Sequence, residues 1–115
     1  MFSGLGSAIM RVRAMRLIVY FDLPVKTAED RRQYTRFRRY LQMQGFIMIQ
    51  ESVYSKIAIN ATAAETVRKN LRNNRPKTGN VILLSVSERQ YQEMEFLVGE
   101  SQNEILDTLD RFVVR

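Results

Sequence analysis

One carboxylate and two groups of basic side chains are the residues of this chain best suited to chemistry. Asp22 is the only acid before Glu29, and it ends a continuous apolar run. A carboxylate can bind Mg²⁺, usually together with a second carboxylate, water or phosphate. A two-fold dimer would supply the second copy, whereas the structural alternative is that Asp22 caps the turn before Pro24 and the following helix. The pattern leaves both interpretations open.

The two basic groups are typical of phosphate-binding surfaces, because guanidinium groups donate paired hydrogen bonds and stay charged. The first group lies on one predicted helix and consists of Arg31, Arg32, Arg36, Arg38 and Arg39. No acid lies between Asp30 and Glu51, whereas a merely solvated helix face usually interleaves glutamate with arginine. The second group, a weaker version of the same signal, consists of Arg68, Lys69, Arg72, Arg75 and Lys77. We predict that both groups bind nucleic acid.

The charge distribution agrees with a polyanionic partner. The 115 residues carry a net charge of +6, but residues 1–87 hold 15 basic and 5 acidic side chains, whereas residues 88–115 hold 3 and 7. This asymmetry favours a polyanion as the partner of the basic body and a protein as the partner of the acidic tail. A well-solvated basic surface is the alternative.

The composition also excludes several classes of protein. There is no cysteine and no histidine, which excludes disulfides and thiolate metal sites and leaves carboxylates as the only bases expected near neutral pH. No apolar run approaches the roughly 18 residues of a membrane span, and the N-terminal stretch is a poor signal peptide. We therefore expect a soluble, cytoplasmic, single-domain protein with no membrane partner and no small-molecule substrate.

Hydrophobic patterning indicates the elements that position these residues. Apolar or alternating runs predict strands at 17–21, 46–50, 53–59 and 81–86, with residues 94–98 as a candidate fifth strand. The first helix is predicted from a cap at Thr27 to Gly45. One side of this helix carries Tyr34, Phe37, Tyr40, Leu41 and Gln44, and the other side carries the five arginines. A capping box from Thr62 to Glu65 is predicted to open the second helix, which stops before Arg75.

The resulting order, β-α-β-β-α-β, predicts an α+β, ferredoxin-like sandwich with an added C-terminal strand and tail. One antiparallel sheet would carry both helices on one face, and its other, apolar face would favour a homodimer. Residues 1–14 carry no periodic pattern and form an N-terminal extension, for which disorder is one interpretation. Residues 15–100 form the domain, and residues 101–115 an acidic tail for contact with a protomer or partner.

Three stretches resemble a known family when taken in this order. They are RLIVYFDLP at 16–24, GFIMIQESVY at 45–54 and LVGE at 97–100. Over about residues 15–100 the chain resembles the small CRISPR-associated spacer-acquisition proteins, the "Cas-two" endoribonuclease family, in the form that accompanies Cas9-type systems. The resemblance implies a homodimer that holds double-stranded prespacer DNA and bridges dimers of the adaptation integrase, which joins the DNA into the CRISPR array.

The resemblance also implies a second activity. Members of the family are described as metal-dependent endonucleases of RNA or DNA, with the strand-end aspartate, here Asp22, holding Mg²⁺ between two protomers. We favour the non-catalytic scaffold over the nuclease, because each subunit offers one candidate carboxylate and no obvious base. A regulatory ferredoxin-like module that binds a small ligand is a third interpretation, but no motif marks a ligand pocket.

Overall fold

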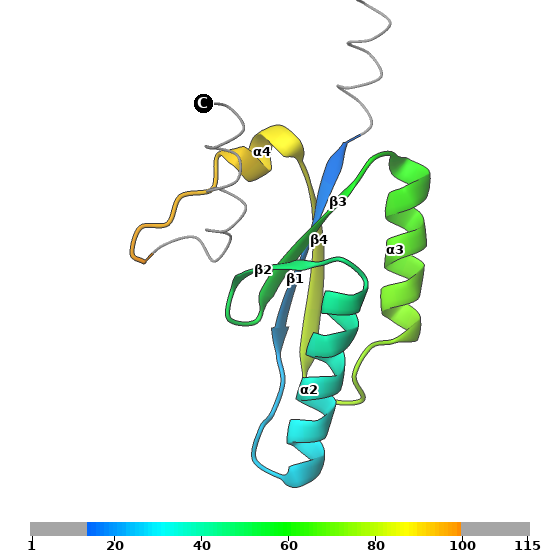
Figure 1. Ribbon diagram of the computed structural model, residues 1–115, viewed down its shortest axis with the longest axis vertical. Coiled ribbons are helices and arrows are strands. Elements are labelled where there is room, and N and C mark those ends of the chain that lie inside the picture. The colour runs from blue at the N-terminus through cyan, green and yellow to red at the C-terminus, as the bar shows by residue number, and fades with distance from the viewer. Residues whose placement is uncertain (1–13, 100–115) are drawn as a thin grey trace, which may run out of the picture.

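The computed structural model describes residues 14–99, which fold into a four-stranded sheet with helices (Figure 1). In chain order the elements are β1 (Met15–Asp22), α2 (Ala28–Met43), β2 (Ile47–Gln50), β3 (Val53–Ala58), α3 (Ala61–Asn73), β4 (Asn80–Ser87) and α4 (Glu88–Gln92). The strand order is β2-β3-β1-β4, and every neighbouring pair is antiparallel. The predicted ferredoxin-like α+β fold is therefore confirmed.

Both long helices pack on the same face of the sheet, as predicted (Figure 1). Val19 and Phe21 of β1 share one buried cluster with Phe37 of α2 and Leu71 of α3. The rings of Phe21 and Phe37 meet edge to face, with centroids 5.3 Å apart. Because side chains alternate along a strand, Arg16 and Tyr20 of β1 lie on the opposite, helix-free face.

The ends of α2 lie where the sequence predicts them. The Thr27 hydroxyl accepts a hydrogen bond from the Asp30 amide at 3.0 Å, and the Asp30 carboxylate accepts one from the Thr27 amide at 3.2 Å. Gly45 follows the C-cap with a φ of +90°, and the amides of Gly45 and Phe46 donate back to the last turn. Gln44, predicted on the same side of the helix as Phe37 and Leu41, is the exposed C-cap.

The start of α3 differs from the prediction. Asn60 is the N-cap, and its side chain accepts a hydrogen bond from the Ala63 amide at 2.7 Å. The predicted capping box at Thr62 is therefore wrong, since Asn60 already occupies the cap two residues earlier. Glu65 does not take part in the cap and instead forms ion pairs with Arg68 and Arg72.

The segment after β4 also differs from the prediction. Ser87 and Gln90 form a capping box that opens α4, and residues 94–98 form no strand. Leu97 and Val98 are 88% and 92% exposed. A strand needs the backbone of a neighbouring strand, and within residues 14–99 none pairs with this segment. The predicted fifth strand is therefore wrong for the single chain.

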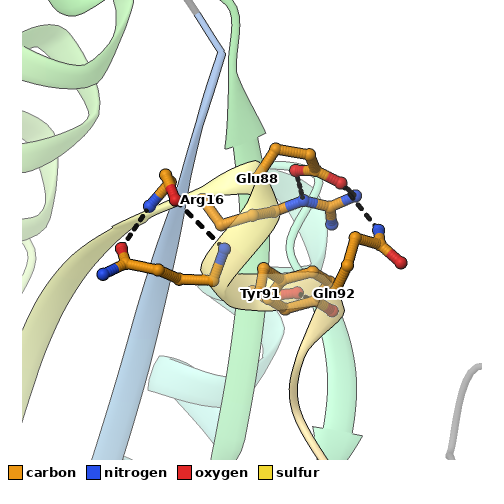
Figure 2. A network of polar contacts seen from close by, with 7 residues as sticks. Arg16, Glu88, Tyr91 and Gln92 are labelled. Carbon is orange, nitrogen blue, oxygen red and sulfur yellow. Dashed lines mark hydrogen bonds and ion pairs between the residues drawn. The ribbon is translucent and has the colours of Figure 1, made fainter.

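The short helix α4 lies across one end of the helix-free sheet face (Figure 2). Glu88 binds the Arg16 guanidinium, with Nε and Oε1 2.8 Å apart, and that guanidinium lies 4.2 Å from the centre of the Tyr91 ring. The Tyr91 and Ser55 hydroxyls share a hydrogen bond of 3.0 Å. Ser55 is fully buried and Ile18 is 4% exposed, so this contact, which the sequence analysis missed, covers part of the face.

The contact between Glu88 and Arg16 should make stability depend on pH below about 4.5. The Arg16 hydrogen bond lowers the pKa of Glu88 from its ordinary 4.5. A carboxylate with a lowered folded pKa stabilises the fold above its unfolded pKa, and this contribution is lost as the pH falls through the folded pKa. Because both side chains are partly exposed, we expect Glu88→Gln to cost at most about 1 kcal/mol of unfolding free energy at pH 7.

Denaturant unfolding of wild type and Glu88→Gln at pH 7 and pH 3 measures this effect. The difference in unfolding free energy should shrink at pH 3, and an equal difference at both pH values would contradict the prediction. Glu93→Gln is the control, because its 3.8 Å pair with Arg89 is solvent-exposed on both sides.

Candidate nucleic-acid interface and strand-end carboxylate

The outer side of α2 carries a stripe of arginines. At 100° per residue, Arg32, Arg36 and Arg39 fall within about 60° of arc on the side opposite the buried Phe37 and Leu41. All three arginines are exposed. We call these three residues the α2 stripe. Its spacing lets one helix present several guanidinium groups to the same extended anion.

The five predicted arginines of α2 have different local partners. Arg31 donates from Nη1 to the carbonyls of Val25 and Lys26, and so holds the loop before the helix. Arg32 lies 2.8 Å from Glu29, which also accepts a hydrogen bond from Gln33. The Gln33 and Arg32 hydrogen bonds lower the pKa of Glu29. Since this pair is exposed, it is weak enough to exchange for a phosphate contact.

The other three arginines of α2 form no such side-chain contacts among the described residues. Within residues 14–99, no hydrogen bond or ion pair fixes the side chain of Arg36, Arg38 or Arg39. Burial raises the pKa of Tyr54 in β3, and the charge of Arg38 opposes this shift. The freely available charges on the α2 stripe are therefore Arg36 and Arg39.

The second basic group is divided between structural and free side chains. Arg68 is partly buried, donates to the Ser85 hydroxyl at 2.7 Å and pairs with Glu65 at 3.4 Å. Arg72 pairs with the same carboxylate at 3.5 Å. Arg75 donates from Nη1 to the Arg72 carbonyl at 2.6 Å, at the C-terminal end of α3. The remaining members, Lys69 and Lys77, are exposed and form no ion pair in the described part of the chain.

Asp22 lies exposed at the end of β1, in register with Asn80 of β4. The turn beside it is tightly packed, because a Cβ on Gly79 would lie 2.8 Å from the Asp22 carbonyl and 2.6 Å from the Leu23 side chain. Gly79 also has a φ of +89°, which disfavours other residues. The cap of α2, an alternative role for Asp22, is instead Thr27.

The Asp22 carboxylate is free to bind a ligand. It has no hydrogen bond or ion pair with any other residue of 14–99. No group of three or more metal-ligating side chains occurs in that range, so the described part of one chain offers an incomplete metal site. Asn80, opposite Asp22 in the register, carries an amide oxygen of the kind that Mg²⁺ accepts, and further ligands would come from water, phosphate or another chain.

Beside Asp22, the helix-free sheet face exposes apolar side chains that α4 does not cover. Tyr20 is 38% exposed, Leu84 44%, Ile57 46% and Ile82 61%. Register places Tyr20 opposite Ile82, and Asp22 follows two residues later opposite Asn80. We call these four side chains the open-face patch. Exposed apolar side chains gathered on one sheet face are typical of a surface that contacts another macromolecule.

Fold and site together define a small basic ferredoxin-like domain with an arginine-rich helix face and a strand-end carboxylate. The sequence pattern of the family described as CRISPR associated protein Cas2 matches residues 15–94. The chain therefore belongs to the Cas2 family of CRISPR-associated proteins, and the resemblance seen in the sequence is confirmed.

Individual relatives agree with this assignment. The chain is 50% identical over 100 residues to the CRISPR-associated endoribonuclease Cas2 of Treponema denticola, covering 87% of this chain and 99% of the relative. It is 44% identical over 99 residues to the protein of the same name in Streptococcus mutans, covering 86% and 91%. A crystal structure of Cas2 shares the fold with a TM-score of 0.55 at 16% identity, over 77% of this chain and 91% of the other.

Two of the segments predicted from the sequence cannot be compared with the structure. The proposed extension at 1–14, apart from Ala14, and the acidic tail at 101–115 lie outside the described residues. Over the described range, no helix is both long and apolar enough to cross a membrane.

Proposed function

We propose that this protein is a dimeric, non-catalytic scaffold of CRISPR adaptation. In this role it binds double-stranded prespacer DNA and bridges dimers of the adaptation integrase during spacer integration in the cytoplasm. The observation that carries the proposal is the α2 stripe, where Arg36 and Arg39 point away from the core with no protein partner among the described residues. The family assignment supplies the CRISPR context.

The arrangement of charges favours a nucleic acid backbone as the ligand. Phosphate contacts are made by exposed cations on a rigid element, and they need no base-reading groups. The α2 stripe is held rigidly because both ends of the helix are capped and its inner side is buried against β1. Binding through it should therefore be strong at low salt and independent of DNA sequence.

The salt dependence of duplex binding tests the proposal. Each neutralised phosphate contributes about −0.9 to the slope of log affinity against log salt concentration. If a dimer uses Arg36 and Arg39 from both copies, we expect a slope of about −4. Fluorescence anisotropy with two unrelated duplexes of equal length, between 50 and 300 mM salt, measures it. An affinity that does not change with salt would contradict the proposal.

The open-face patch supports the homodimer. Packing the patch of one copy on that of another would cover its apolar side chains, and it would bring two Asp22 residues to one interface by symmetry. The exposed Leu97 and Val98 add apolar surface that a single chain leaves uncovered. Both features favour a two-fold dimer over a monomer, because a dimer can remove this apolar surface from water.

A charge in the open-face patch should break the dimer. We expect Ile82→Asp to yield a folded monomer, because an unpaired carboxylate in an apolar interface loses its hydration. Light scattering coupled to size exclusion measures the mass. Val25→Asp is the matched control, since Val25 is also exposed, at 52%, but lies in the loop before α2. A dimeric Ile82→Asp protein would place the interface elsewhere.

A Mg²⁺-dependent endonuclease is the second candidate function, favoured by the free Asp22 carboxylate and by the endoribonuclease name of the relatives. The side chains present fit such a metal in part: Asp22 would hold it, with Asn80 and the Asp22 of a second copy as further oxygen ligands. Bound Mg²⁺ activates water and stabilises charge that develops on a phosphate. The α2 stripe would then serve to bind the RNA or DNA substrate.

A further inference from the structure

A small cleft lies between α2 and the loop that joins α3 to β4. Its volume is about 180 Å³. It is lined by Gln33, Arg36, Phe37, Tyr40, Asn73, Asn74, Arg75, Pro76 and Lys77. The cleft therefore joins one arginine of the α2 stripe to two members of the second basic group, although these residues lie about 40 positions apart in the sequence.

Three cations line this cleft and no carboxylate does. Arg36 and Lys77 form no ion pair with any described residue, and Arg75 uses only Nη1 on the Arg72 carbonyl. Glu29 belongs to the exposed pair with Arg32 and does not line the cleft. Like charges gathered around a recess repel one another, so the arrangement is stabilised when an anion enters.

Neutral polar groups complete the cleft. The Tyr40 side chain of α2 and the Asn74 side chain at the end of α3 both line the cleft. Asn74 in turn donates from Nδ2 to the Asn70 carbonyl at 2.8 Å. Burial raises the pKa of Tyr40, so its phenol stays protonated and uncharged. The Asn74 and Arg75 side chains are thus held by hydrogen bonds before any ligand arrives, which lowers the entropic cost of binding.

The size of the cleft limits the ligand. Sites for drug-sized molecules occupy roughly 300–1,000 Å³, so 180 Å³ suits a smaller group. A terminal phosphate presents three free oxygens and a charge of about −1.5 to −2 near neutral pH. An internal phosphodiester carries about one charge, and its strand must both enter and leave the recess. Three cations that line one recess match the terminal group better.

We propose that this cleft binds the terminal phosphate of a nucleic acid strand, with Arg36, Arg75 and Lys77 as its cationic ligands. The inference rests on the proposed function, because it identifies which part of the bound nucleic acid enters the cleft. The cleft would recognise the end of a strand, whereas the α2 stripe contacts phosphates without distinguishing base sequence. Arg32 and Arg39 of the α2 stripe would contact internal phosphates while Arg36 and the rest of the cleft fix the end of the strand.

Duplexes with phosphate or hydroxyl termini, at the 5′ end in one pair and at the 3′ end in another, test the proposal. We expect wild type to bind one phosphorylated form about tenfold more tightly than its hydroxyl counterpart. Arg36→Gln and Lys77→Gln should abolish this preference. Arg38→Gln and Lys69→Gln are matched controls that remove the same charges outside the cleft, and they should keep it.

Inorganic phosphate provides an independent probe. Titrating it into the protein should shift the amide NMR signals of residues 73–77, and the shifts should vanish in Arg36→Gln but persist in Arg38→Gln. No shift, or equal losses in both variants, would overturn the proposal. Equal binding of phosphate and hydroxyl ends would overturn it while leaving duplex binding intact. Absence of all duplex binding, with the phosphate shifts retained, would instead overturn the scaffold function and limit the cleft to free phosphate.

Discussion

Replacing Arg32, Arg36 and Arg39 together by alanine should lower the affinity for double-stranded DNA by about a hundredfold or more. A hydrogen bond to a charged group contributes about 1.5 kcal/mol at the lower end, a factor of about ten. Three such contacts are removed, although the release of Glu29 from Arg32 offsets part of the loss. Because phosphates carry no base information, the loss should be the same for unrelated sequences.

The salt slope separates this effect from misfolding. The triple alanine variant should have a slope shallower by about one for each lost phosphate contact per dimer. A triple lysine variant keeps the charges and should largely retain the slope, with some loss of affinity from the missing paired donors. Arg89→Ala removes a 90% exposed cation on α4 and should leave binding unchanged. If the triple alanine variant binds like wild type, the α2 stripe is not the DNA surface.

Asp22→Asn should abolish any Mg²⁺-dependent cleavage of RNA or DNA by the purified protein, while duplex affinity changes less than about twofold. The amide keeps the shape of the carboxylate but removes the charge that binds Mg²⁺. Stability should stay close to that of wild type, because Asp22 is exposed and its carboxylate has no partner within residues 14–99. Cleavage of labelled RNA and DNA, with Mg²⁺ and with chelator, measures the activity.

The matched control for Asp22 is Glu95→Gln, an equal charge change at an exposed position away from the strand end. It should leave cleavage as in wild type. Cleavage that persists in Asp22→Asn at the wild-type rate would show that this carboxylate does not hold the metal, and it would point to another nuclease in the preparation.

Most of the fold could be predicted because its signals are local. The apolar run of β1, the cap at Thr27 and the stop at Gly45 each depend on residues close together in sequence, and the structure confirms them. The cap of α3 was misplaced because Asn60 and Thr62 are both good N-cap residues. The strand at 94–98 was mispredicted because β-prone residues form a strand only where a neighbouring strand can pair with them.

The site was harder to predict because its details depend on contacts between distant residues. Composition shows many arginines on α2, but not that Arg31 holds a loop or that Arg32 faces Glu29. Nothing in the sequence spacing places Arg36 beside Lys77. The contact of α4 with the sheet was signalled only by the capping pattern of Ser87 and Gln90, which is short and easily overlooked.

A spacer-integration assay in vitro with the cognate integrase tests the scaffold role most directly. Wild type, Asp22→Ala and the triple alanine variant of Arg32, Arg36 and Arg39 would be compared for insertion of a labelled prespacer into a CRISPR array. The scaffold account predicts that Asp22→Ala integrates normally and that the triple variant fails. If Asp22→Ala fails while it still binds DNA and integrase, the carboxylate takes part in the chemistry and the scaffold account is contradicted.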